Sequence, residues 1–118
     1  MTSPSERCLF CRIVNGEIPA RKVDEDSETF AFEDINPQAP THILVIPKRH
    51  IASLDELTDG DDATIGRTIR TAARIAHDRH LDADGYRVVI NCGEAAGQTV
   101  FHIHIHLLGG RSFSWPPG

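Results

Sequence analysis

The sequence contains the stretch His102-Ile103-His104-Ile105-His106-Leu107-Leu108, in which imidazole and aliphatic side chains alternate. Alternate residues of a β-strand share one face and lie about 6.5–7 Å apart. We therefore predict a strand over residues 100–108, with three imidazoles on one side and aliphatic side chains buried on the other. Single histidines on strands are usually structural, but three in strict alternation favour metal binding or nucleophilic and acid–base chemistry.

The other apolar runs predict the remaining strands of a sheet. Residues 29–32 alternate, which predicts a strand with one buried face. Residues 42–46 form a continuous β-branched and apolar run that Pro47 ends, which predicts a buried strand. Residues 86–91 predict a second buried strand. Together with the histidine strand they predict an antiparallel sheet.

Three segments predict helices beside this sheet. Residues 9–14 carry apolar side chains at helical spacing, and residues 53–56 show a capping-box pattern that opens a second short helix. Residues 61–80 predict one long amphipathic helix packed on the sheet. Its expected apolar stripe is Ile65, Ile69, Ala72, Ala73 and Ala76. The fold class is therefore α+β, with one long and one or two short helices.

Length and composition limit the class of protein. The 118 residues suffice for one domain, residues 1–118, of which the polar residues 1–7 are expected to be flexible. The net charge of −5 with neutral histidines argues against nucleic acid as the main partner. No apolar run approaches the roughly 20 residues that span a bilayer, and the first residues do not form a secretory signal. We expect a cytoplasmic protein that associates with neither nucleic acid nor membrane.

The spacing of Cys8 and Cys11 indicates metal binding or redox chemistry in a chain without an export signal. A closed tetrahedral zinc site needs two further ligands, for which His50 and His102 are the candidates. That division would leave His104 and His106 for the reaction. Two unpaired buried thiols explain the cysteines equally well on this pattern alone.

The loop at residues 93–99 leads directly into the histidine strand and contains two glycines. Glycines let backbone N–H groups approach a phosphate closely, although a plain connecting loop is the alternative. Thr99 adds a hydroxyl at the same point, and Asp34 can accept hydrogen bonds from sugar hydroxyls. Leu9, Phe10, Ile13 and Phe32 either form a slot for a nucleotide base or simply belong to the core.

Residues 102–108 match the HxHxHφφ motif, where φ is apolar, and the sequence resembles the histidine-triad (HIT) superfamily. Other segments are similar to its Hint branch, the purine nucleoside phosphoramidases. These segments are Gly16-Glu17-Ile18-Pro19-Ala20, Asp34 to His42, Pro47-Lys48-Arg49-His50, Gly97-Gln98-Thr99-Val100, Leu108 to Arg111, and Trp115-Pro116-Pro117-Gly118. The resemblance covers nearly the whole chain, from about Cys8 to Gly118.

The resemblance implies a HIT-like fold and a two-fold homodimer, in which the tail at residues 109–118 reaches toward the partner's active site. It implies that His104 is the nucleophile, that His106 contacts the phosphate, and that His42 is a supporting histidine behind the site. Thr99 stands where close relatives have serine, and its hydroxyl should assist the leaving amine.

The resemblance also implies the residues around the nucleotide and the metal. Asp34 would bind the ribose, and Asn91 would lie near the phosphate and the leaving group. The expected nucleotide-binding set is Leu9, Phe10, Ile13, Phe32, Asp34, Ile35, Asn91, Gly97, Gln98, Thr99, His104 and His106. Many bacterial members, and the related galactose-1-phosphate uridylyltransferases, bind zinc with a cysteine pair and two histidines. By that pattern a structural zinc would be held by Cys8, Cys11, His50 and His102.

The expected reaction is hydrolysis of the P–N bond of a purine nucleoside 5′-phosphoramidate through a covalent nucleotidyl-histidine intermediate. Its ligands would be purine nucleotides of the AMP or GMP type, and no catalytic cofactor is needed. One alternative is a dinucleoside polyphosphate hydrolase or nucleotidyltransferase of the same superfamily. Others are a catalytically vestigial purine-nucleotide-binding protein and a small zinc-dependent interaction module.

Overall fold

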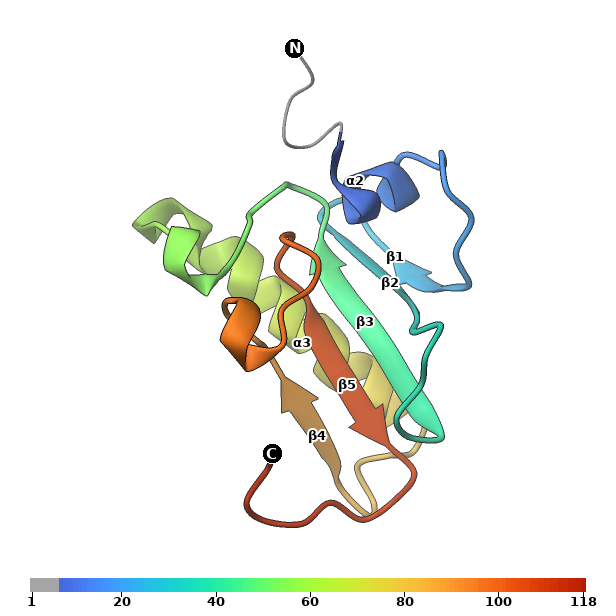
Figure 1. The fold of residues 1–118 in the computed structure, drawn as a ribbon. Coiled ribbons are helices and arrows are strands. Elements are labelled where there is room, and N and C mark those ends of the chain that lie inside the picture. Colours follow the sequence, from blue (N-terminus) through green and yellow to red (C-terminus); the bar gives the residue numbers. More distant parts are fainter. Residues whose placement is uncertain (1–6) are drawn as a thin grey trace.

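Strand β3 (Thr41–Pro47) lies at the centre of a five-stranded antiparallel sheet in a computed structural model that describes residues 7–118. The other strands are β1 (Lys22–Glu25), β2 (Thr29–Glu33), β4 (Tyr86–Val89) and β5 (Ile105–Gly109), in the order β1-β2-β3-β5-β4. Helix α3 (Asp62–Asp78) covers one face of the sheet, and the short helix α2 (Leu9–Val14) lies against the other (Figure 1). The α+β class and the antiparallel sheet are confirmed.

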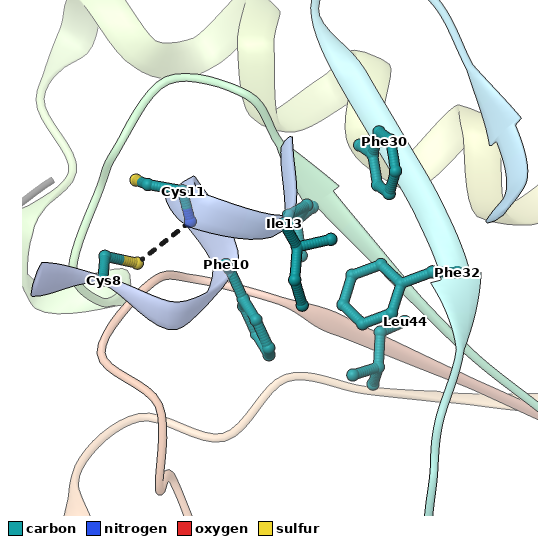
Figure 2. Close-up of a cluster of buried hydrophobic side chains, with 8 residues drawn as sticks. Cys8, Phe10, Cys11, Ile13, Phe30, Phe32 and Leu44 are labelled. Carbon is teal, nitrogen blue, oxygen red and sulfur yellow. Dashed lines mark hydrogen bonds between the residues drawn. The ribbon is translucent and has the colours of Figure 1, made fainter. Parts of the chain in front are cut away.

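Alternation along β3 creates two separate apolar clusters. Ile43 and Val45 point toward α3 and pack with Ile75 and Ala76 of that helix. Leu44 and Ile46 point the other way, and with Phe10, Ile13, Phe30 and Phe32 they form the cluster under α2 that Figure 2 shows. His42 shares the parity of Leu44, and His106 is paired with Leu44 in the register. The histidines therefore line the face of the sheet opposite α3.

The long helix is present, but the face that it buries differs in part from the predicted apolar stripe. Ile69 is 43% exposed and Ala73 is also exposed, whereas the buried residues are Thr68, Thr71, Ala72, Ile75 and Ala76. The two threonines can be buried because their hydroxyls donate to the carbonyls of residues four positions earlier, Thr64 and Arg67, at 2.7 and 2.9 Å. The prediction was right for Ala72 and Ala76 and wrong for Ile69 and Ala73, because it counted threonine as polar.

Three predicted boundaries differ from the structure. Regular pairing of the histidine strand begins only at Ile105, so residues 100–104 are irregular. The predicted buried strand at 86–91 is an edge strand that ends at Val89, with Tyr86 and Val88 about two-fifths exposed. The segment after Ser53 forms a 3₁₀ turn without the expected side-chain cap, and Thr58 and Asp61 form the capping box instead.

Two short segments complete the described fold. The second 3₁₀ turn, Asp59–Asp61, leads directly into α3, and the third, Glu94–Ala96, lies between β4 and β5. No helix within residues 7–118 is long and apolar enough to cross a bilayer. The expectation of flexibility at the N-terminus concerns residues that, except for Arg7, lie outside the described range.

Asp26 closes the turn between β1 and β2, and we expect its removal to destabilise the protein. Its Oδ1 accepts hydrogen bonds from the backbone N–H groups of Glu28 and Thr29, both at 2.8 Å. Burial raises the pKa of this carboxyl, but the two N–H donors and Arg67 outweigh it and lower the pKa to about 2. The Asp26→Ala variant should lose about 1–2 kcal/mol in urea unfolding at pH 7.

The pH dependence gives a check on this assignment. Because the pKa is lower in the folded state, the carboxylate stabilises the fold fully above the ordinary pKa near 4. The stabilisation is lost as the pH falls toward 2. The difference between wild type and Asp26→Ala should therefore shrink between pH 5 and pH 2, and the Asp26→Asn variant, which keeps an acceptor, should lose less. An unchanged difference at pH 2.5 would show that the charge plays no part.

Candidate active site and metal-binding cluster

His104 is held in one tautomer by the backbone just before β5. Its Nδ1 lies 2.8 Å from the carbonyl oxygen of His102, so Nδ1–H donates and Nε2 keeps its lone pair. The ring is 7% exposed, and the edge-on ring of Phe10 packs against it with centroids 5.1 Å apart. A buried imidazole that is oriented in this way, with one basic nitrogen available, can act as a nucleophile.

Two further histidines, His42 and His106, form a hydrogen-bonded chain on the same face of the sheet. The backbone N–H of Gln38 donates to Nδ1 of His42 at 3.0 Å, so the proton of His42 is on Nε2. That Nε2–H donates to Nδ1 of His106 at 2.9 Å. The remaining proton of His106 is therefore on its Nε2, where it can be donated to an anion. Asp34 completes the group, with Oδ2 3.3 Å from His42 Nε2.

Burial keeps these imidazoles neutral. Burial, together with the neighbouring His104 and His42, lowers the pKa of His106 to about 4. Burial likewise lowers the pKa of His104 and of His42, against the opposing charge of Asp34 in both cases. Near pH 7 the site therefore presents neutral rings, which is the state that a nitrogen nucleophile requires.

Four other side chains gather where α2 meets the irregular segment before β5. They are Cys8, Cys11, His50 and His102, and their ligand atoms all lie within 4.8 Å of one another. Nδ1 of His102 is 3.4 Å from each cysteine sulfur, and Nδ1 of His50 is 3.4 Å from the sulfur of Cys11. Ligands at the corners of a tetrahedral zinc site are about 3.3–3.8 Å apart, so the spacing fits that ion.

The surroundings of the cluster also suit a metal ion. His102 donates from Nε2 to the carbonyl of Pro47 at 2.7 Å, which leaves the Nδ1 lone pair facing the sulfurs. Burial lowers the pKa of His102 to about 4, so the ring is neutral. Burial, together with Cys8, raises the pKa of the Cys11 thiol to about 12. Two sulfurs this close therefore need a cation in order to act as thiolates.

A second group of potential ligands, Asp34, His42 and His106, is also compact. It is better explained by hydrogen bonding, because the 2.9 Å contact between the two rings uses the lone pair that a metal would need.

The loop between β4 and β5 meets the site from one side. Gly93 and Gly97 have φ values of 89° and 100°, which favour glycine, and they allow the tight path around the 3₁₀ turn. The cleft that contains His42 and His106 has a volume of about 250 Å³, and Asn91 also lines it. An ideal Cβ on Gly97 would lie 3.7 Å from the amide nitrogen of Asn91. The glycine loop therefore adjoins the histidine cleft.

The structure distributes the expected nucleotide-binding residues unevenly. Phe10, Ile13 and Phe32 are buried in the cluster under α2, whereas Leu9 is 43% exposed and Ile35 is fully exposed. The exposed Thr99 lines a cleft of about 570 Å³ together with Leu9, His50 and Phe101, on the side of the metal-binding cluster. Both polar atoms of the Gln98 side-chain amide are bonded to backbone atoms, and the backbone N–H of Gln98 donates to the Gly93 carbonyl at 3.0 Å. Gln98 was expected to bind the nucleotide, but these hydrogen bonds within the protein already occupy its side-chain amide.

Two arginines at the histidine cleft were not expected from the sequence. Arg87 of β4 and Arg111, just after β5, line the cleft with His42 and His106, and both guanidinium groups lie over the ring of Phe113. Arg87 also donates to the carbonyl of Ser114 at 2.8 Å, so it ties the tail to the sheet. The sequence feature that could have indicated Arg87 is its position as a basic residue within a half-buried strand.

The fold and the site define a class of small α+β proteins with a buried, oriented imidazole beside a Cys₂His₂ cluster. Residues 15–113 match the HIT domain. The chain is 54% identical to a HIT-like protein of Synechococcus elongatus over 97% of this chain and 99% of that protein. The chain belongs to the HIT domain family.

Other relatives agree with this assignment. A 14 kDa zinc-binding protein of Zea mays is 47% identical over 93% of this chain and 87% of its own length. The crystal structure of a HIT family hydrolase from Legionella pneumophila superposes with a TM-score of 0.93, at 50% identity, over 95% of this chain and 100% of that one. A histidine triad protein from Clostridium difficile gives 0.89 at 42% identity, over 97% of both chains.

Proposed function

We propose that this protein hydrolyses purine nucleoside 5′-phosphoramidates at the P–N bond, with His104 as the nucleophile. The observation that carries the proposal is the tautomer of His104, whose Nδ1–H is bound to the His102 carbonyl while Nε2 keeps its lone pair. The hydrolase named among the structural relatives supports a hydrolytic reaction. The similarity to Hint phosphoramidases in the glycine loop and the C-terminal segment supports the choice of substrate.

In the first step Nε2 of His104 attacks the α-phosphorus, and the bond from phosphorus to the leaving nitrogen breaks. The amine departs with a proton taken from solvent, and the Thr99 hydroxyl assists that transfer. The Nδ1 proton stays on the ring of His104 and is donated to the His102 carbonyl, and this hydrogen bond stabilises the positive charge that develops on the ring. His106 donates from Nε2 to a phosphate oxygen, where negative charge must be stabilised.

In the second step water attacks the same phosphorus and loses a proton to solvent. The bond between phosphorus and Nε2 of His104 breaks, so the lone pair returns to the ring and the nucleoside monophosphate is released. This route replaces one difficult displacement with two easier ones.

Asp34 and the apolar residues near α2 are proposed to bind the nucleoside. The two oxygens of Asp34 contact the N–H of Asn36 at 2.8 Å and His42 at 3.3 Å. A carboxylate has about four acceptor positions, so two remain for the ribose hydroxyls. Leu9 and Ile35 expose apolar surface, and we propose that they contact the purine.

We propose that Cys8, Cys11, His50 and His102 hold a structural zinc ion. The distances of 3.4 Å and the hydrogen bond of His102 to Pro47 support this assignment, as does the zinc-binding relative from Zea mays. Bound zinc would supply the charge that keeps both sulfurs as thiolates and would fasten α2 to the sheet. We also propose a cytoplasmic location, where these cysteines stay reduced.

We propose that two chains pair through β4. This strand is an edge of the sheet, and Tyr86 and Val88 expose 37% and 40% of their surface. Light scattering should give twice the chain mass of 13.0 kDa for the wild type. A Val88→Lys variant should shift toward the single-chain mass, because a charge at the centre of the contact opposes burial. A wild-type mass of one chain at 0.1 mM would contradict the proposal.

The reaction is tested by incubating the purified protein with adenosine 5′-phosphoramidate and following the phosphorus signal by NMR. Conversion to AMP is the expected result, and the guanosine compound should also be cleaved. Diadenosine polyphosphate is the comparison substrate, since faster cleavage of it would favour a polyphosphate hydrolase. Binding of AMP without turnover of either compound would indicate a nucleotide-binding protein instead.

A further inference from the structure

The side chain of Gln98 is 1% exposed and makes three hydrogen bonds, all to backbone atoms. Its Oε1 accepts from the N–H of Gly93 at 2.9 Å, and its Nε2 donates to the carbonyls of Ala52 at 2.8 Å and Val100 at 3.2 Å. The amide thus joins both ends of the glycine loop to a segment more than forty residues away. A buried amide with every polar atom bonded fixes the backbone around it.

Both segments held by Gln98 belong to the site. Ala52 lies two residues after His50, and next to it the Ile51 carbonyl accepts from the N–H of Ile103 at 2.7 Å. On the other side, Gly97 approaches the amide nitrogen of Asn91, which lines the cleft of His42 and His106. A displacement of residues 93–100 would therefore move Gly97 relative to Asn91 at the edge of this cleft.

We propose that Gln98 is a positioning residue, which holds the loop at residues 93–100 at the edge of the histidine cleft in the geometry that the reaction needs. The inference rests on the proposed function, because it assigns to this loop the stabilisation of charge on the phosphate. Such stabilisation acts on the transition state more than on bound substrate, so its loss lowers kcat more than it raises KM.

Two variants separate the hydrogen bonds. Gln98→Glu keeps the size and an acceptor for Gly93 but replaces the donor to Ala52 and Val100 with an oxygen. Gln98→Ala removes all three contacts. In both, kcat for adenosine 5′-phosphoramidate should fall by about 10–100-fold, since small misplacements of catalytic groups have effects of this size. KM should change by less than about threefold, because the nucleoside is bound elsewhere.

The control for a general loss of stability is Thr71→Val. Thr71 is 5% exposed and donates to the Arg67 carbonyl on α3, on the opposite face of the sheet. This variant should lose stability without a change in kcat per folded molecule. Hydrogen exchange of the Gly93 amide should become at least about tenfold faster in Gln98→Ala and stay unchanged in Thr71→Val.

The proposal is overturned if kcat per folded molecule is the same in the Gln98 variants and in Thr71→Val, or if KM alone rises. If the wild type cleaves no phosphoramidate, the proposed function fails, and titration with AMP followed by NMR still tests the loop. AMP should then shift the amide signals of Gly97 and Asn91 in wild type and Thr71→Val but not in Gln98→Ala. Equal shifts in all three proteins would exclude a positioning role.

Discussion

Replacement of His104 by alanine should lower hydrolysis of adenosine 5′-phosphoramidate by on the order of 10⁴-fold or more, because the attacking atom is removed. In the wild type the His102 carbonyl and the ring of Phe10 hold the imidazole of His104, and neither of these groups is a nucleophile that could replace it. The measurement is the initial rate of AMP release, and binding of AMP by the variant shows that the nucleotide pocket is intact.

A matched control and an intermediate test accompany this variant. His77 is exposed on α3, and His77→Ala should retain the wild-type rate. Quenching the wild-type reaction in alkali, where phosphoramidate bonds to histidine survive, should trap a nucleotide on a peptide that contains residue 104. A His104→Ala protein that releases AMP within tenfold of the wild-type rate would remove His104 from the mechanism.

The arrangement of the histidines was predictable, because strict alternation of histidine with aliphatic residues is typical of a β-strand with one buried face. The prediction placed the imidazoles on one side of the strand and the aliphatic side chains on the other. The register of β5 agrees for His106, which is paired with Leu44 on the face of the sheet opposite α3. The prediction was wrong about the strand before Ile105. His102 leaves the ladder so that its Nδ1 can face the cysteines, and the His102 carbonyl then bonds His104 instead of a strand.

The remaining features depended on long-range contacts that one sequence does not show. His50 and His102 were candidate partners of Cys8 and Cys11, but the cysteine pattern alone left two unpaired thiols as an equal alternative. Only the folded chain brings His102 to the cysteines, over ninety residues away. Gln98 gave no signal of burial, because an amide in a glycine loop is usually exposed. The phase of α3 was missed for a similar reason, since Thr68 and Thr71 can be buried only when their hydroxyls bond to the helix backbone.

Loss of the metal-binding cluster should affect stability more than catalysis. In Cys11→Ser a hydroxyl replaces one sulfur, and a hydroxyl is a poor zinc ligand because it stays protonated. The free energy of unfolding should fall by roughly 3–5 kcal/mol, which corresponds to a decrease in Tm of roughly 10–20 °C for a domain of this size. Calorimetry measures the decrease in Tm and in the free energy of unfolding, and zinc analysis of the same samples measures how much metal each protein holds.

Stability should be affected more than catalysis because the cluster joins α2 to His50 and His102. Cys8 is the N-cap of α2 and Cys11 lies within it, and this helix of only six residues has little stability of its own. Without a metal ion α2 would be held by its apolar contacts alone, whereas His104 would keep its hydrogen bond to the backbone. The rate per folded molecule should therefore fall less than tenfold at 25 °C. Cys92→Ser, outside the cluster, is the control, and a zinc-free protein as heat-stable as the zinc-loaded one would contradict the structural role.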